Sequence, residues 1–411
     1  MTNSQFATLT ESPPAIASSS AGLSRTHQAA SRYRGRRVVL CVNAAWNVLN
    51  FRSGLVSSMI SSGYEVVAIA PSDEYAADVV ALGARFVPLS LSRKGCNPFS
   101  ELGVLLRLAR VLMRERPDVY LGYTIKPNIY GSLVCRALRI PVINNVTGLG
   151  AAFAPNSRLT PLVQRLYRWA FGRSSRVFFQ NEDDRATFLQ AGIVREEQTM
   201  RLPGSGIDLA KFAPQPLPAV GPGCTFRFLL VARLLWDKGV GEYVEAARRL
   251  RAGGVDVECC LLGFIDEGNP QGIPRQTVEQ WHAEGVINYL GSTRDVRPLL
   301  ASAHCVVLPS YREGVPRSLL EAASLGRPVI TTDAVGCRDT VDDGLSGYLV
   351  RPRDVDDLTN KMGAIATMPA PPLAQMGLCG RRKMERQFGE QLVVGQYLQD
   401  IRSAVRKRST A

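Results

Sequence analysis

The chain contains no apolar run of the roughly 18 residues that a transmembrane helix needs. Its first residues lack the continuous apolar core of a secretory signal, so we do not expect export. The nine cysteines include no C-x-x-C pair and leave an odd count, which argues against a zinc site or a disulfide framework. The sequence therefore predicts a cytoplasmic protein whose cysteines are small buried side chains.

Positive charge is concentrated in the first half of the chain. The net charge of +13 divides into +11 for residues 1–205 and +2 for residues 206–411. A one-sided basic surface suits an anionic partner such as nucleic acid, acidic lipid or pyrophosphate, although excess arginine can also serve solubility alone. There is no zinc-finger spacing and no RNA-binding signature, so we expect no nucleic acid and favour a membrane surface.

The length of 411 residues exceeds what one hydrophobic core usually supports, so two domains are expected. Residues 1–36 are rich in Ser, Thr, Ala and Pro before they turn basic, which predicts a flexible tail. Beyond them, short apolar segments alternate with helical stretches, as in parallel sheets covered on both faces. The segments expected to be strands are Val38–Val42, Val66–Ala70, Val119–Leu121, Val142–Asn144, Val177–Phe179, Phe228–Val231, Val257–Leu262, Cys305–Leu308 and Val329–Thr331.

Prolines clustered between positions 203 and 222 mark a domain boundary. The prediction is α/β, with doubly wound domains at 37–205 and 223–387 joined by a linker at 206–222. A last helix, 388–411, is expected to return to the first domain.

The segment 310–330 carries the most specific pattern. An apolar strand ends at Leu308, Glu313-Gly314 forms a turn, and Pro316 fits the first turn of a helix that Gly326 ends. A helix that begins directly after a parallel strand offers free N–H groups and a positive dipole end to a phosphate. We therefore expect this segment to offer a binding position for a phosphate.

Glu313 and Glu321 lie eight residues apart, roughly 12 Å along a helix. That separation lets one carboxylate hold the hydroxyls of a sugar and the other those of a ribose, with the diphosphate between them. For the pair alone, surface glutamates beside a helix cap are the commoner explanation.

The sequence around these glutamates resembles the retaining family-four glycosyltransferases. It reads Glu-Gly-x-Pro-Arg-Ser-Leu-Leu-Glu-Ala and is followed by Gly-Arg-Pro-Val-Ile. Further matches are Val231–Gly239, Leu290–Thr293, Gly344–Val350 and Pro203–Asp208, so the resemblance covers nearly all of residues 37–400. It implies the GT-B fold, in which two Rossmann-like domains face a central cleft.

The resemblance also implies roles for individual residues. Arg233 and Lys238 take the diphosphate-binding positions and, with Glu313, form the catalytic set, because bond cleavage leaves negative charge on the departing nucleotide. The donor-binding residues are expected to be Gly263, Thr293, Gly314, Val315, Pro316, Arg317 and Glu321. We expect no metal and no cofactor, since Asp354-Val-Asp356 reads better as a helix cap than as a cation site.

The acceptor side departs from the common family pattern. Many members carry a histidine in the acceptor domain, but this chain has only His27, His282 and His304, which excludes a His-based role there. Gly122–Tyr130 and Asn144–Gly150 resemble instead the subgroup that extends sugars on polyprenyl diphosphate carriers, including bacterial N-acetylgalactosaminyltransferases. The acceptor-binding residues are expected to be Tyr123, Lys126, Asn128 and Thr147. Lys126 is either a phosphate ligand or an ordinary lysine on a strand-to-helix loop.

Two basic amphipathic stretches, 101–116 and 158–176, fit helices that lie on an anionic bilayer. Packed helices with snorkelling arginines are the alternative. Docking on the membrane would bring the protein close to an acceptor that is carried on a membrane lipid.

The function expected from the resemblance is transfer of an N-acetylhexosamine or hexose from a UDP-sugar to a polyprenyl-diphosphate-linked glycan. The protein would be peripheral, on the cytoplasmic face of the inner membrane. Two alternatives share the architecture: a nucleotide-sugar epimerase or hydrolase, and a non-catalytic nucleotide-sugar-binding regulator.

Overall fold

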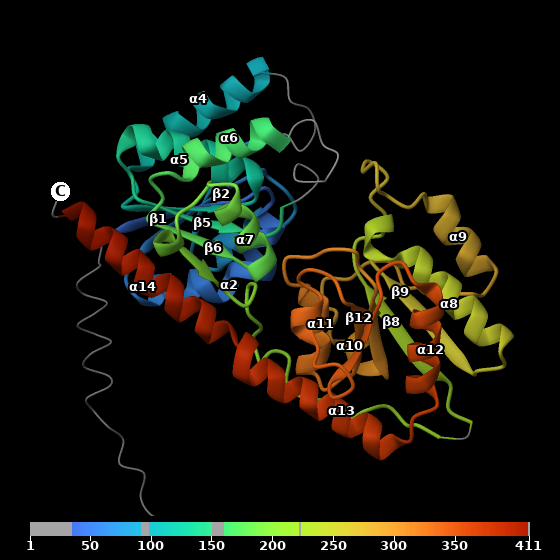
Figure 1. Cartoon of the computed structure of the whole chain (residues 1–411). Helices are drawn as coiled ribbons and strands as arrows, with labels where there is room; N and C mark the ends of the chain where they lie inside the picture. The colour runs from blue at the N-terminus through green and yellow to red at the C-terminus, as the bar shows by residue number, and fades with distance from the viewer. Residues whose placement is uncertain (1–34, 92–97, 150–159, 222, 410–411) are drawn as a thin grey trace, which may run out of the picture.

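The computed structural model describes residues 35–91, 98–149, 160–221 and 223–409, which form two α/β domains (Figure 1). Each domain is built on one parallel sheet. The predicted fold class, α/β with two doubly wound domains, is confirmed. Most of the predicted tail, Cys96, Gly150, Arg158 and Pro222 lie outside the described residues.

The first domain has a seven-stranded sheet in the order β3-β2-β1-β4-β5-β6-β7. Its strands are β1 (Arg37–Cys41), β2 (Glu65–Ala70), β3 (Arg85–Pro88), β4 (Val119–Tyr123), β5 (Val142–Val146), β6 (Arg176–Phe179) and β7 (Thr199–Arg201). Its helices are α2 (Ala45–Ser61), α3 (Ala76–Ala81), α4 (Pro98–Glu115), α5 (Ile125–Leu138), α6 (Thr160–Phe171) and α7 (Glu182–Gln190). Helices α4, α5 and α6 form one layer on this sheet, and α2 covers the opposite face (Figure 1).

The second domain has a six-stranded sheet in the order β10-β9-β8-β11-β12-β13. Its strands are β8 (Phe226–Val231), β9 (Val257–Leu262), β10 (Asn288–Tyr289), β11 (Cys305–Leu308), β12 (Val329–Thr332) and β13 (Gly347–Val350). Its helices are α8 (Val240–Ala252), α9 (Arg275–Ala283), α10 (Arg297–Ser302), α11 (Arg317–Ser324), α12 (Val355–Ala366) and α13 (Ala370–Lys383). Helices α8 and α12 pack together, as do α11 and α13.

In both sheets the strand order reverses beside the first strand of the domain. The chain runs outward from β1 or β8 in one direction and then crosses to β4 or β11 on the other side. The crevice at the carboxyl ends of such neighbouring strands is where ligands bind in doubly wound sheets. The fold therefore creates two candidate binding positions, one in each domain.

All nine predicted strands are confirmed. Those named from sequence are central and buried, which explains their continuous apolar runs. The strands that were not predicted, β3, β7, β10 and β13, lie at or toward the sheet edges and are short or polar. The cap prediction is also confirmed, because the Asp354 side chain accepts a hydrogen bond from the Asp357 N–H at the start of α12.

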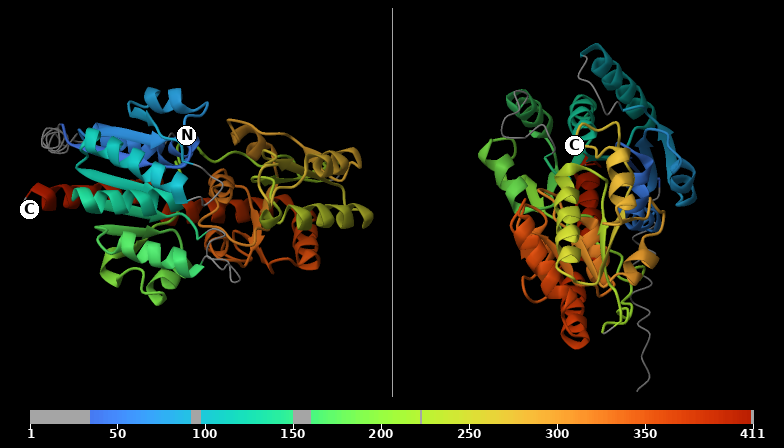
Figure 2. Two further views of the ribbon diagram at one scale, coloured as in Figure 1. Left: turned by 90° about the horizontal axis from the view of Figure 1, so that it is seen from above. Right: turned by 90° about the vertical axis from the view of Figure 1, so that its right-hand side faces the viewer.

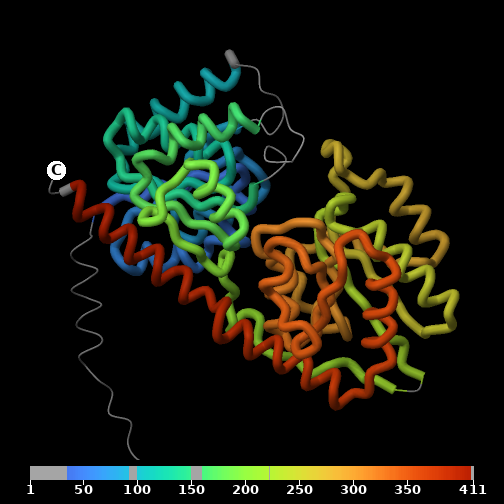
Figure 3. Tube along the Cα trace, in the orientation of Figure 1, coloured from blue at the N-terminus to red at the C-terminus, as the bar shows by residue number. Residues whose placement is uncertain are grey.

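The chain crosses between the domains twice, and the two crossings lie next to each other. The segment after β7 packs on the second domain, where Ile207 and Phe212 are buried in its core. The last helix, α14 (Glu390–Ser409), lies along the first domain (Figures 2 and 3). Its Tyr397 and Ile401 are buried in the core of the first domain. Ile207 pairs with Gly389, so the outgoing and returning strands of chain are hydrogen-bonded side by side.

Candidate functional site

Lys238 and Glu313 meet where the strand order of the second sheet reverses. Lys238 ends a short turn (Trp236–Lys238) after β8, and Glu313 follows the neighbouring strand β11. The Lys238 ammonium donates to Glu313 Oε1 at 2.6 Å, with the two side chains only 12% and 19% exposed. Gly239, at φ +71°, lets the turn approach the Pro309 carbonyl, which a Cβ would meet at 2.1 Å. A cation and a carboxylate therefore converge at the expected ligand position.

Arg233 lies on the same β8 loop but is not part of this pair. Its side chain is 51% exposed and comes within 4.0 Å of Asp266. An exposed guanidinium with one long contact is free to turn toward an anion. The structure thus brings two of the three expected catalytic residues into contact and leaves the third on the same loop.

Glu321 pairs with Arg317 one turn earlier in α11. Arg317 Nε donates to Glu321 Oε1 at 2.9 Å, and its guanidinium lies over the Phe51 ring of the first domain at 5.6 Å. Burial raises the pKa of Glu321, although the charge of Arg317 opposes the rise. The helix begins at Arg317, with Pro316 as its N-cap residue, one position later than the sequence suggested.

The remaining donor-side residues lie on neighbouring loops of the same domain. Gly263 follows β9, and its N–H donates to the Gly291 carbonyl at 2.8 Å. A Cβ on Gly263 would stand 1.7 Å from the Ala232 carbonyl, so the β8 and β9 loops touch only because this residue is glycine. Thr293 is exposed. Its hydroxyl donates to the Asp295 carbonyl and accepts from the Asp295 N–H.

Gly314 and Val315 lie at the contact between the two domains. A Cβ on Gly314 would meet Gln180 Oε1 and the Thr147 carbonyl, both at 2.4 Å, and both belong to the first domain. A Cβ on Gly204 would come within 2.9 Å of the Val315 Cβ. The carboxyl ends of the two sheets therefore face each other, and Thr147, expected on the acceptor side, touches the donor loop.

Lys126 lies in the first turn of α5, so it is not on a loop as the sequence suggested. Its ammonium donates to Glu101 Oε1 of α4 at 2.6 Å, and Tyr130 donates to the other oxygen of Glu101 at 2.7 Å. Burial alone would raise the pKa of Glu101, but the hydrogen bonds from Lys126 and Tyr130 together outweigh it and lower the pKa. Lys126 is thus engaged in joining two helices.

Tyr123 and Asn128 were expected to contact an acceptor, and the structure places both side chains inside the domain. Tyr123 is 2% exposed, lies under the Arg52 guanidinium at 4.4 Å and packs beside Tyr397. Asn128 is 1% exposed and donates to the Asn145 carbonyl at 2.9 Å. Tyr123 thus packs β4 against α14, and Asn128 ties α5 to β5.

Sequence reasoning did not identify the segment Gln180–Asp184, which follows β6. Asn181 caps α7 and also donates to the Gly314 carbonyl at 3.1 Å, and Asp184 pairs with Arg312 of the second domain. A run of polar residues directly after an apolar strand, at a helix start, is the signal that would have found it. No sequence pattern indicates that this segment contacts Gly314 and Arg312 of the second domain.

Other reactive side chains lie away from this region. His304 accepts from the Arg227 N–H and contacts the Ala219 carbonyl, which holds the interdomain segment. The eight cysteines in the described part of the chain are free thiols. Within the described residues no three His, Cys, Asp or Glu side chains gather as metal ligands, and no helix is long and apolar enough to cross a bilayer.

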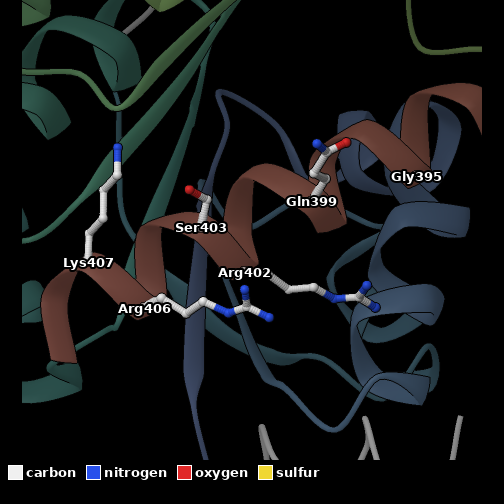
Figure 4. A pocket seen from close by; sticks show the side chains of 6 residues that line it. All are labelled: Gly395, Gln399, Arg402, Ser403, Arg406 and Lys407. Atoms are coloured by element: carbon white, nitrogen blue, oxygen red, sulfur yellow. The ribbon is translucent and has the colours of Figure 1, made fainter. Parts of the chain in front are cut away.

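A groove of about 630 Å³ runs along α14 (Figure 4). Its lining residues come from that helix: Gly395, Gln399, Arg402, Ser403, Arg406 and Lys407. None of the expected site residues lines it.

Two parallel-sheet domains with facing carboxyl ends give the GT-B architecture, with a cation–carboxylate pair at the switch point of the second sheet. Residues 50–204 match the family described as glycosyl transferase 4-like domain, and residues 225–367 match glycosyl transferases group 1. The chain belongs to this family of glycosyltransferases.

Named relatives fall in the same class. An N,N'-diacetylbacillosaminyl-diphospho-undecaprenol alpha-1,3-N-acetylgalactosaminyltransferase of Campylobacter jejuni is 28% identical over 80% of this chain and 89% of its own length. A UDP-Gal:alpha-D-GlcNAc-diphosphoundecaprenol alpha-1,3-galactosyltransferase of Escherichia coli is 26% identical over 71% of this chain and 76% of its own.

Solved structures agree on the fold. HepE of Anabaena, in complex with UDP, superposes with a TM-score of 0.71 over 90% of this chain and 100% of its own, at 16% identity. A glycosyltransferase from Rickettsia africae gives a TM-score of 0.72 over 90% and 98%, also at 16% identity.

Proposed function

We propose that this glycosyltransferase moves a sugar, an N-acetylhexosamine or hexose, from a UDP-sugar to a glycan carried on a polyprenyl diphosphate, with retention of configuration. The observation that carries the proposal is the contact of Lys238 with Glu313 at the switch point of the second sheet. Relatives whose names specify undecaprenyl-diphosphate-linked substrates, and a structural neighbour in complex with UDP, support this substrate class.

In this proposal the donor diphosphate lies beside the start of α11, within reach of Lys238 and Arg233. The acceptor hydroxyl forms its bond to the anomeric carbon on the face from which the diphosphate departs. The electron pair of the breaking C–O bond goes to the diphosphate, and the hydroxyl proton moves to a phosphate oxygen. Lys238 and Arg233 stabilise the leaving charge, Glu313 holds the sugar and Glu321 the ribose. No metal or cofactor enters this scheme, and that prediction remains to be tested.

A donor screen tests the proposal. Purified protein is incubated with UDP-hexoses and UDP-N-acetylhexosamines and with lipid-linked sugars extracted from bacterial membranes, and products are analysed by mass spectrometry. We expect a product one sugar heavier than the acceptor, and release of UDP that depends on acceptor. Donor conversion or hydrolysis without acceptor would instead identify an epimerase or hydrolase. UDP binding without turnover would identify a regulator.

We further propose that helices α4 and α6 dock on an anionic membrane. Five large apolar side chains of these helices are at least half exposed, and they are Leu102, Leu106, Met113, Leu162 and Trp169. Their exposed charged neighbours are arginines: Arg107, Arg110, Arg114, Arg165 and Arg168.

The two acidic residues of α4 lie inside. Glu101 and Glu115 have side chains only 14% and 6% exposed, and both pair with cations of the domain. The exposed charge of this layer is therefore positive, which suits acidic lipid headgroups with apolar side chains inserted among them. Such docking corresponds to a peripheral protein on the cytoplasmic face of the inner membrane.

Sedimentation with vesicles tests this surface. We expect binding to vesicles of phosphatidylglycerol and phosphatidylethanolamine, no binding to pure phosphatidylcholine, and release by salt. Leu106→Gln with Trp169→Gln should weaken binding at least fivefold, whereas Leu345→Gln, at an exposed leucine of the second domain, should leave it unchanged. Equal binding by both variants would reject the surface.

A further inference from the structure

We propose that Asn181 of the first domain is a positioning residue for Glu313. The Glu313 carboxylate is then held in its donor-binding position only while the two domains are in contact. The inference rests on the proposed function in that it takes Glu313 as the group that holds the donor sugar. It concerns a residue that lies outside the second domain and contacts Glu313 only through the backbone.

Asn181 has two separate tasks. Its Oδ1 accepts the Asp184 N–H at 2.8 Å, which caps α7. Its Nδ2 donates to the Gly314 carbonyl at 3.1 Å and lies 3.5 Å from the Glu313 carbonyl. The side chain is completely buried, so these bonds form in a site without water competition. One amide therefore ties a helix start in the first domain to the donor loop in the second.

An ion pair supports the amide. Asp184 Oδ2 lies 3.2 Å from Asn181 Nδ2, and Asp184 Oδ1 pairs with the guanidinium of Arg312, directly before Glu313. Asp184 is 0% exposed, and burial raises its pKa against the opposing charge of Arg312. A buried carboxylate that loses its cation is costly, so this pair holds the domains at this spacing.

The donor loop has a second anchor that does not depend on the first domain. The Glu313 N–H donates to the Val335 carbonyl at 3.0 Å. Gly336, at φ +78°, lies against the same loop, and a Cβ there would stand 2.3 Å from the Glu313 and Gly314 carbonyls. When the domains separate, the Val335 anchor stays and the Asn181 anchor is lost. The backbone that carries Glu313 is then held on one side only.

The substitution Asn181→Ser separates the two tasks. A serine hydroxyl still caps α7 but is too short to reach the Gly314 carbonyl. We expect kcat for glycosyl transfer to fall 10-fold to 100-fold, while the KM for donor and the Kd for UDP change less than threefold. Hydrogen–deuterium exchange of residues 312–316 should become faster. Arg312→Met should reproduce these changes, and Arg312→Lys should restore most of kcat.

The matched control is Glu182→Gln, which changes charge two residues from Asp184. Glu182 is exposed and pairs with Arg185, three residues further along α7 in the same domain. We expect its kcat and exchange to stay within twofold of the parent. An Asn181→Ser kcat within twofold of the parent, or equal losses of kcat, UDP affinity and melting temperature, would overturn the inference. If the parent shows no transfer at all, the proposed function fails, and unchanged exchange in Asn181→Ser then rejects the positioning separately.

Discussion

Each domain contains a short ion pair between a lysine and a glutamate, and the surroundings of the two pairs differ. Lys238 donates to Glu313 and Lys126 donates to Glu101, each at 2.6 Å, and each lysine follows a strand at the switch point of its sheet. Glu101 uses both carboxylate oxygens, one for Lys126 and one for Tyr130. Within the described part of the chain, the Glu313 carboxylate accepts only from Lys238, which leaves its second oxygen for a ligand.

The Lys238–Glu313 pair can therefore still accept a ligand, whereas the Lys126–Glu101 pair is a structural contact. The donor-side pair joins two loops that face the other domain, whereas the acceptor-side pair joins helices α4 and α5. In the proposed function, charge recognition of the donor therefore belongs to the second domain. The corresponding part of the first domain is held instead by hydrogen bonds of the buried residues Asn128, Asn144 and Asn145.

The largest effect is expected from Lys238→Ala. Loss of one preorganised cation opposite a developing anion costs roughly 10²-fold to 10³-fold in kcat. Donor affinity should fall far less, because the ground state carries less charge at the bond that breaks. Steady-state kinetics measures both, and Lys361→Ala, at a lysine of α12 that lies over Tyr348, is the control. An unchanged rate would refute the catalytic role and, with it, the distinction between the two pairs.

Gly314→Ala should have the next largest effect on activity. The new methyl group would stand 2.4 Å from Gln180 Oε1 and the Thr147 carbonyl, so the domains must move apart. A displacement of about 1 Å at a reacting group can cost on the order of 100-fold, and we expect a loss of 10-fold to 100-fold in kcat. Gly395→Ala, where a Cβ meets open space, should be neutral in the same kinetic assay. Full activity in Gly314→Ala would show that the donor loop does not depend on the first domain.

Most of the donor side could be predicted from sequence because its residues are close along the chain or lie in one motif. Glu313, Glu321 and Arg317 fall within nine residues, and a strand-to-helix turn places them on one edge. The contact of Asn181 with Gly314 joins positions 133 residues apart, and no local pattern encodes it. Tyr123 ends β4 and Asn128 lies in α5, and the sequence did not indicate that their side chains point inward.

The buried amides of the first domain give a prediction about stability. Asn144 is 0% exposed, donates to Asn128 Oδ1 and Ser132 Oγ at 3.0 Å each, and accepts from Ser174 at 2.7 Å. Asn144→Ala leaves these partners unsatisfied, so we expect a loss of about 2–3 kcal/mol in unfolding free energy. Denaturant unfolding measures it. Asn50→Ala, which removes one hydrogen bond at the surface of α2, should cost under about 1 kcal/mol.

Lys126→Ala should mainly affect stability if its pair is a brace. The partly exposed contact with Glu101 predicts a loss of about 1 kcal/mol, measured by thermal unfolding. The KM for a lipid-linked acceptor should change less than threefold, and Glu101→Gln should behave alike. A tenfold rise in acceptor KM for Lys126→Ala alone would instead make Lys126 a phosphate ligand, as the sequence first suggested.

The smallest effect concerns a carboxylate without a lysine or arginine partner. Among the described residues Glu390, where α14 begins, forms no ion pair, and burial raises its pKa above the ordinary 4.5, with the charge of Arg317 opposing the rise. The folded protein therefore holds this proton more tightly than the unfolded chain, and stability falls as pH rises from about 4.5 through the folded pKa. Glu390→Gln cannot ionise, so it should melt slightly higher than the parent at pH 8, and the difference should vanish as pH approaches 4. A variant that melts lower at pH 8 would mean that the ionised carboxylate stabilises the crossing between the domains, as a paired one would.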